Sequence, residues 1–127
     1  MIRSTVADVD LDAIEHNTRA VRRRAGVDVI AVVKADGYGH GAEAVAGAAI
    51  EGGASSLAVA TVEEAVVLRR ARPRDPLLVL LGAQEQAERD AAVALDLAVT
   101  VWDVDAARAR CVKTPSIRTP GNAAIAR

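Results

Sequence analysis

Residues 29–41 read VIAVVKADGYGHG, and this stretch decides how the rest of the chain is interpreted. Residues 29–33 form an unbroken aliphatic run without alternation, which predicts a strand buried on both faces of a parallel sheet. The run stops at Lys34, and a loop with three glycines follows. A residue directly after such a strand lies where α/β folds build their active sites. Lys34 is therefore the first candidate for chemistry.

The alternation of strands and helices continues on both sides of this stretch. Apolar residues at helical spacing predict a helix at about 11–25, with Asp10 as its N-cap and Gly26 after its end. Further helices are predicted at about 42–51, 61–71 and 84–95, the second of them opened by a capping box of Thr61 and Glu64. Further strands are predicted at 57–60, 77–81 and 97–102. This order predicts an α/β fold made of right-handed βαβ units.

The alternation fits both a doubly wound sheet and a TIM-type (β/α)8 barrel. Such a barrel typically needs roughly 200–250 residues, so the four strands here would make about half of it. Half a barrel predicts two exposed sheet edges. Residues 112–127 contain two prolines and no acidic residue, and they are predicted to form a disordered or aberrant tail. The expected organisation is one domain over 1–111 followed by that irregular C-terminal tail.

Composition excludes several classes of function. A net charge of −1 and a pI of about 6.1 argue against a nucleic-acid-binding surface, and the arginines at 22–24 are expected at a solvated helix end. The one cysteine, Cys111, allows no internal disulfide, indicates a reducing compartment and has no neighbours at metal-ligand spacing. No secretory signal is recognised, and the longest aliphatic run, 77–81, is too short to cross a bilayer. We therefore expect a cytoplasmic protein without a metal site, a nucleic-acid partner or a membrane partner.

Lys34 and Tyr38 suit chemistry on one small ring. The chain contains 14 arginines but only two lysines, and a lysine is needed where a free amine must attack a carbonyl carbon. An ammonium placed against Val and Ala is poorly solvated, which is expected to lower its pKa and to favour the free amine. Four residues span at most about 13 Å. The Lys34 amine can therefore engage an aldehyde while the Tyr38 phenol binds a phosphate on the same molecule.

Simpler interpretations apply to the same residues. A lone lysine at a strand end is most often a surface cation, and a glycine-rich turn is most often only a turn. The pattern Gly37-x-Gly39-x-x-Ala42 loosely matches a dinucleotide-binding fingerprint, but it lies too far from the strand and has a bulky Tyr in its tight turn.

Five other residues are given structural rather than catalytic roles. His40 is expected to make a local hydrogen bond rather than to carry protons. Trp102 is expected to pack in the interior and His16 to lie on the surface. Glu63 and Glu64 are interpreted as acids of a first helical turn rather than as a catalytic pair.

The ten residues at 32–41 closely resemble the cofactor-attachment motif V-V-K-A-[ND]-[AG]-Y-G-H-G of alanine racemases. Three further stretches resemble the same family in the same order: ADVDLDAI at 7–14, GASSLAVA at 53–60 and LVLLGA at 78–83. The resemblance covers roughly residues 5–105. It implies a barrel of fold type III that binds pyridoxal 5'-phosphate and interconverts L- and D-alanine for peptidoglycan synthesis. It also implies a small amino acid as substrate and a homodimer as the assembled form.

The resemblance also implies roles for particular residues. Lys34 would hold the cofactor as a Schiff base and act as one of two catalytic bases. Tyr38 would bind the cofactor phosphate. Leu81 would touch the pyridine ring, although the third strand is one residue longer than usual, so that Leu80 is the alternative.

The sequence departs from the family pattern after the fourth strand. Family members are much longer and carry there a K-x-D-T-G-M-x-R-x-G stretch, whose arginine lies near the ring oxygen, whereas this chain reads CVKTP at 111–115. The second base, a tyrosine from the neighbouring subunit, has no counterpart here. We therefore expect a truncated racemase. The alternatives are a catalytically inactive fragment, or a sibling barrel such as a basic amino-acid decarboxylase or a protein that handles pyridoxal phosphate.

Overall fold

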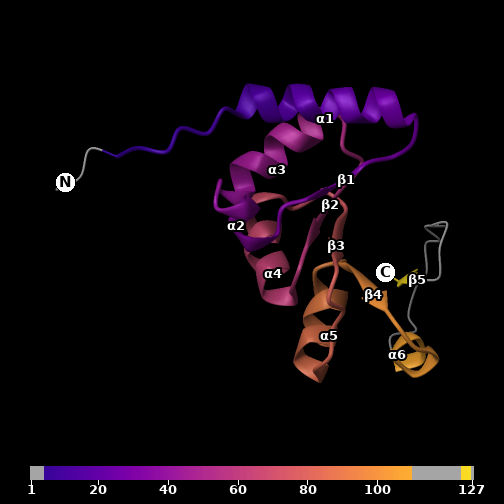
Figure 1. Cartoon of the computed structure of the whole chain (residues 1–127). Helices are drawn as coiled ribbons and strands as arrows, with labels where there is room; N and C mark the ends of the chain where they lie inside the picture. The colour runs from indigo at the N-terminus through magenta and orange to yellow at the C-terminus, as the bar shows by residue number, and fades with distance from the viewer. Residues whose placement is uncertain (1–4, 110–123, 127) are drawn as a thin grey trace.

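The computed structural model describes residues 5–109 and 124–126, and it has the predicted α/β order (Figure 1). The elements are α1 (Leu11–Ala25), β1 (Ile30–Val32), α2 (Lys34–Tyr38), α3 (Ala42–Glu51), β2 (Ser56–Val59), α4 (Val62–Ala71), β3 (Leu77–Val79), α5 (Gln86–Ala94), β4 (Ala98–Val101), α6 (Val104–Ala109) and β5 (Ala124–Ala126). The helices predicted at 11–25 and 42–51 are confirmed at those bounds. Strands β1, β3 and β4 are shorter than predicted, β2 has the predicted length but begins one residue earlier, and neither α2 nor α6 was predicted. Within the described ranges, no helix is long and apolar enough to cross a membrane.

The order of the strands separates the two predicted architectures. Strands β1 to β4 are parallel, and each pairs with the next strand along the chain, as in Ala31 with Leu57, Leu57 with Leu77, and Leu78 with Ala98. A doubly wound sheet reverses its strand order at a switch point, whereas a barrel adds its strands in sequence. Four successive parallel strands therefore form an arc of a (β/α)8 barrel, and this prediction is confirmed.

The two faces of the sheet are packed differently. On one face, strand side chains such as Leu57, Val59 and Val79 form the main core with α3, α4 and α5. The opposite face carries a smaller cluster made of strand residues and the residue after β3: Ala58, Leu78, Ala98 and Leu80. We call this second face the strand-only face. It corresponds to the inner wall of a barrel, because the helices of a barrel lie outside its strands.

Strand β1 differs from its prediction. Ile30 and Val32 are 37% and 39% exposed, so the strand is not buried on both faces. The cause is position, since β1 is the edge strand of the sheet and only β2 flanks it among the described residues. Val32 pairs with Ala58 of the strand-only face, whose cluster contains no helix residue among those described, so this face of the edge strand lacks the covering layer that the prediction assumed.

The edge of the sheet beside β4 is covered. Strand β5 pairs with β4 antiparallel, with Thr100 opposite Ile125, so the prediction of an exposed edge beside the fourth strand is wrong. The short strand satisfies backbone groups that β4 would otherwise present unpaired. It lies inside the tail predicted to be irregular. The other residues of that tail, and Cys111, lie outside the described residues.

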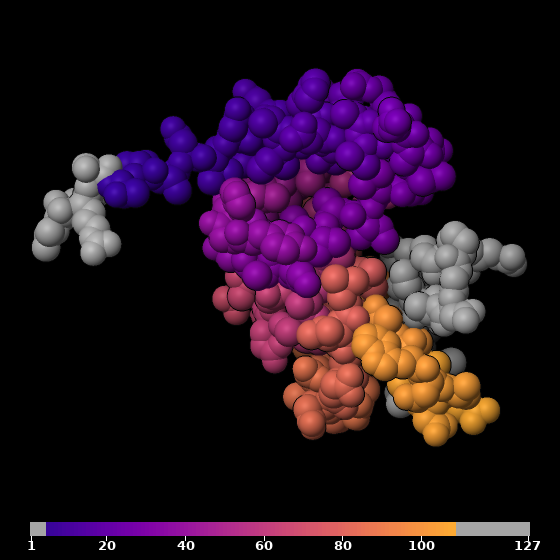
Figure 2. All heavy atoms as spheres, viewed as in Figure 1, coloured from indigo at the N-terminus to yellow at the C-terminus, as the bar shows by residue number. Residues whose placement is uncertain are grey.

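Helix α1 lies across the carboxyl end of α3 (Figures 1 and 2). The side chain of Asp10 accepts a hydrogen bond from the Ala13 N–H at 2.9 Å, and Gly26 ends the helix at φ +67°, as predicted. A Cβ added at Gly52 would lie 2.5 Å from the Glu15 carbonyl oxygen. The absence of a side chain at Gly52 therefore allows α1 and α3 to approach this closely.

Candidate active site

The turn after β1 has an unusual backbone. Three residues of α2 other than glycine, namely Ala35, Asp36 and Tyr38, have φ values of +51°, +53° and +57°. Gly37 between them has φ +63°, so the segment is a left-handed turn rather than an α-helix. A left-handed conformation costs a residue with a Cβ roughly 1–2 kcal/mol. Such strain persists where the surroundings fix the backbone, and it gathers at functional sites.

Two carboxylates fix this left-handed turn. Glu64 accepts hydrogen bonds from the Ala35 N–H at 2.9 Å and from the Ala60 N–H at 2.8 Å. Within the turn, Asp36 Oδ1 accepts a hydrogen bond from the Ala42 N–H at 2.8 Å, and this bond connects the turn to the start of α3. A hydrogen bond to a charged group contributes about 1.5–3 kcal/mol. These contacts therefore offset much of the backbone strain.

Lys34 and Tyr38 lie at the two ends of α2. Lys34 follows Val33, whose N–H donates to the Ala58 carbonyl oxygen at 2.8 Å, and its side chain is half-buried. Tyr38 is 58% exposed. Across the described part of the chain, neither the Lys34 ammonium nor the Tyr38 hydroxyl makes a hydrogen bond or an ion pair. Both polar ends are thus available for a ligand at the carboxyl edge of the sheet.

The two leucines after β3 lie in different environments. Leu80 packs against Ala58, Leu78 and Ala98 on the strand-only face. Leu81 is 56% exposed and lies outside that cluster.

Among the other residues considered, two predictions of a structural role are confirmed. The His40 ring Nδ1 lies 3.0 Å from the Gly37 carbonyl oxygen and 3.1 Å from that of Tyr38, which is the expected local hydrogen bonding. His16 is exposed, as predicted.

The prediction for Trp102 is wrong, and the one for Glu64 is incomplete. Trp102 is 61% exposed, because it follows the last residue of β4 and leaves the sheet there. The Thr61 hydroxyl oxygen accepts from the Glu64 N–H, as a capping box requires. The Glu64 carboxylate, however, binds Ala35 and Ala60 instead of returning to the Thr61 N–H.

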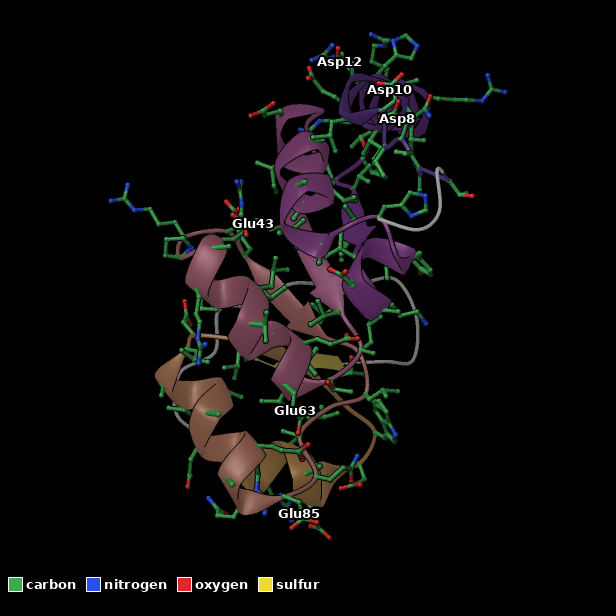
Figure 3. All side chains as sticks on the ribbon, turned by 90° about the vertical axis from the view of Figure 1, so that its left-hand side faces the viewer. Asp8, Asp10, Asp12, Glu43, Glu63 and Glu85 are labelled. Atoms are coloured by element: carbon green, nitrogen blue, oxygen red, sulfur yellow. The ribbon has the colours of Figure 1, made fainter. Side chains whose placement is uncertain are left out.

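A cavity of about 500 Å³ lies behind the left-handed turn, between α3 and α4. Its walls include Val33 and Val59 of the main core, so it is on the helix side of the sheet rather than on the strand-only face. Glu43 and Glu63 are at its rim, and Figure 3 shows them on α3 and α4. The cavity is therefore separate from the face that carries Leu80.

Comparison with known proteins decides the family. A family model described as "Alanine racemase, N-terminal domain" matches residues 9–119. The chain belongs to the alanine racemase family. The alanine racemase of Symbiobacterium thermophilum is 48% identical over 103 residues, which are 80% of this chain and 27% of that protein. "Alanine racemase 2" of Bacillus subtilis is 51% identical over 82 residues, which are 63% of this chain and 21% of that protein.

Solved structures of alanine racemases share the fold. The enzyme of Bacillus anthracis with bound L-Ala-P has a TM-score of 0.75 at 40% identity and covers 86% of this chain and 28% of its own. The alanine racemase of Bartonella henselae with covalently bound pyridoxal phosphate has a TM-score of 0.60 at 32% identity and covers 68% and 24%. The chain therefore spans about a quarter of the length of these relatives and folds as the N-terminal part of their barrel.

Proposed function

We propose that this chain supplies the cofactor-anchoring part of an alanine racemase that depends on pyridoxal 5'-phosphate. In this proposal residues 1–111 form the N-terminal part of the cofactor-binding barrel, and Lys34 carries the cofactor. The observation that carries the proposal is the half-buried Lys34 at the carboxyl end of β1, whose ammonium has no hydrogen-bonding or ionic partner in the described ranges. Membership of the alanine racemase family supports it independently.

The residues at this edge fit the cofactor. A primary amine such as that of Lys34 is the group that forms an imine with an aldehyde. Tyr38 is four residues further along the chain, and its hydroxyl can donate a hydrogen bond to an oxygen of the cofactor phosphate. When bound, the cofactor supplies an electron sink for the negative charge that develops on the substrate α-carbon. Once the substrate amine had displaced Lys34 from the aldehyde carbon, the freed Lys34 amine would remove the α-proton on one face of the substrate, and the resulting ammonium would return a proton there in the opposite direction. Tyr38 keeps the phosphate end fixed while this happens.

For the contact with the pyridine ring we propose Leu80 rather than Leu81. Leu80 belongs to the cluster on the strand-only face, and a barrel holds its ligand at the end of that inner wall. Leu81 is largely exposed and is the weaker candidate.

The proposed substrate is alanine of either hand, and the proposed assembly is a homodimer. Racemisation needs a second base on the opposite face of the substrate, and the family resemblance assigns it to a tyrosine of the neighbouring subunit. Supply of D-alanine for peptidoglycan is the proposed biological role. A cytoplasmic location is proposed because a chain with one cysteine suits a reducing compartment.

Titration of the purified 127-residue chain with pyridoxal phosphate tests the proposal. The expected result is the visible absorption band of a lysine Schiff base, present in the wild type and in the control Lys113→Ala. The band should be lost in Lys34→Ala, and also in Lys34→Arg, because a guanidinium stays protonated and is not a nucleophile. A band that survives both Lys34 substitutions would refute the proposed role of this lysine.

A further inference from the structure

The carboxylate of Glu64 joins the turn that carries Lys34 to the next strand of the sheet. We propose that Glu64 is a positioning residue, which holds the Lys34 backbone so that the amine and Tyr38 can engage one cofactor at the same time. This inference rests on the proposed function, and it assigns to Glu64 a role beyond its place in the first turn of α4.

The geometry of the contact supports this role. One oxygen of Glu64 accepts from the Ala35 N–H at 2.9 Å, directly after Lys34, and the other accepts from the Ala60 N–H at 2.8 Å, directly after β2. The pairing of β1 with β2 ends just before these residues, with the bond from the Val33 N–H to the Ala58 carbonyl oxygen. The single carboxylate therefore continues the connection of the two strands at the point where the backbone ladder stops.

Glu64 is itself held by a well-packed helix. Its own N–H donates to the Thr61 hydroxyl oxygen at 3.3 Å, and the side chains of Ala65 and Leu68 in the same helix are 0% and 3% exposed. The position of the carboxylate is thus set by α4 rather than by the turn. A rigid donor–acceptor frame of this kind is what a reacting group needs from its supporting residues.

The backbone of the left-handed turn is expected to change conformation when the hydrogen bond to Glu64 is lost. Ala35 and Asp36 are held at positive φ, which residues with a Cβ leave unless their surroundings fix them. Ala35 is the next residue after Lys34 in the chain. A change of the Ala35 backbone conformation therefore reorients the Cα–Cβ bond of Lys34. A shift on the order of 1 Å between two groups that must act together can lower an effective molarity by roughly 100-fold.

Neighbouring Glu63 provides a matched control. It has the same side chain and charge, is exposed at the start of α4 (Figure 3), and makes no hydrogen bond or ion pair within the described ranges. Glu64→Gln keeps the volume of Glu64 but replaces one acceptor oxygen by an NH2 group. This group is a donor, so it cannot accept a hydrogen bond from the backbone N–H that it faces. Glu64→Asp keeps the charge but is one methylene too short to reach both amides.

The experiment compares two aldehydes on the full 127-residue chain. Pyridoxal phosphate can be held at Lys34 and Tyr38 together, whereas pyridoxal lacks the phosphate and reports only on the amine. Wild type and Glu63→Gln should form the Schiff base at a lower concentration of pyridoxal phosphate than of pyridoxal. Glu64→Gln and Glu64→Asp should lose most of this preference, with a roughly tenfold or larger rise in the apparent Kd for pyridoxal phosphate and little change for pyridoxal.

Amide hydrogen exchange supplies a readout that needs no cofactor. In Glu64→Gln the Ala35 amide should exchange roughly tenfold faster or more, as expected for loss of a hydrogen bond to a charged group, while the core amide of Leu68 stays protected. Unchanged exchange at Ala35, or a preference for pyridoxal phosphate retained by both Glu64 variants, overturns the positioning role and leaves the proposed function standing. A wild-type chain that forms no Schiff base at Lys34 overturns the proposed function and this inference with it.

Discussion

Substitution of Gly52 by alanine tests how α1 is attached to the barrel arc. The added Cβ would lie 2.5 Å from the Glu15 carbonyl oxygen and 2.8 Å from Thr18 Cβ, both in α1. Gly52 itself has φ −70°, which alanine adopts freely, so the backbone adds no strain and the whole penalty comes from the clash. Overpacking of this kind typically costs about 1–3 kcal/mol.

Gly47 in the same helix α3 is the control. A Cβ there meets only Arg72 Nη1 at 3.6 Å, an ordinary contact. Gly47→Ala should therefore stabilise the chain by roughly 0.5–1 kcal/mol through the lower flexibility of the unfolded state.

Urea unfolding followed by circular dichroism measures both changes. With a slope of roughly 1–3 kcal/mol per M, the midpoints of Gly52→Ala and Gly47→Ala should differ by on the order of 1 M, with the wild type between them. A Gly52→Ala chain as stable as the wild type would refute the close packing of α1 on α3.

Three further predictions concern the site and the core. Leu80→Ala should weaken binding of pyridoxal phosphate more than Leu81→Ala in the same absorbance titration, and equal or reversed effects would contradict the proposed ring contact. Arg69 donates to four backbone carbonyl groups that follow α4 and α5, so Arg69→Ala should cost about 1–3 kcal/mol by urea unfolding, whereas the exposed Arg70→Ala should stay within about 0.5 kcal/mol. Gly37→Ala should lower the stability by about 1–2 kcal/mol and weaken the binding of pyridoxal phosphate, because φ is +63° there and the new Cβ would lie 3.3 Å from the start of α3. An unchanged absorbance titration would argue against a tightly fixed turn.

Much of the fold could be predicted because local signals agree with tertiary structure. Asp10 and Gly26 mark the two ends of α1, and the helix at 42–51 lies between a glycine-rich loop and a glycine pair. The place of Lys34 at the end of β1 followed from one aliphatic run and its abrupt stop. These features depend on residues close together in the sequence.

The rest depends on contacts between distant segments. The exposure of β1 follows from its position at the sheet edge, and the pairing of β4 with β5 joins residues far apart in the chain. Ala and Tyr rarely adopt positive φ, so the values at Ala35 and Tyr38 go against the preference of their residue types. Contacts with residues elsewhere in the fold enforce this conformation, and the local sequence does not reveal them. The hydrogen bond from the Ala35 N–H to the Glu64 carboxylate spans 29 positions, so the four-residue capping box at 61–64 showed only the cap and not this second contact.

Mapping the site of cofactor attachment tests the proposed role of Lys34 most directly. Borohydride reduction of the chain mixed with pyridoxal phosphate fixes the Schiff base covalently, and peptide mass spectrometry then locates the label. We expect the label on Lys34, with Lys113 essentially unmodified at equal cofactor and protein concentrations. Label divided equally between the two lysines, or found mainly on Lys113, would contradict the claim that the fold sets Lys34 apart as the reactive amine.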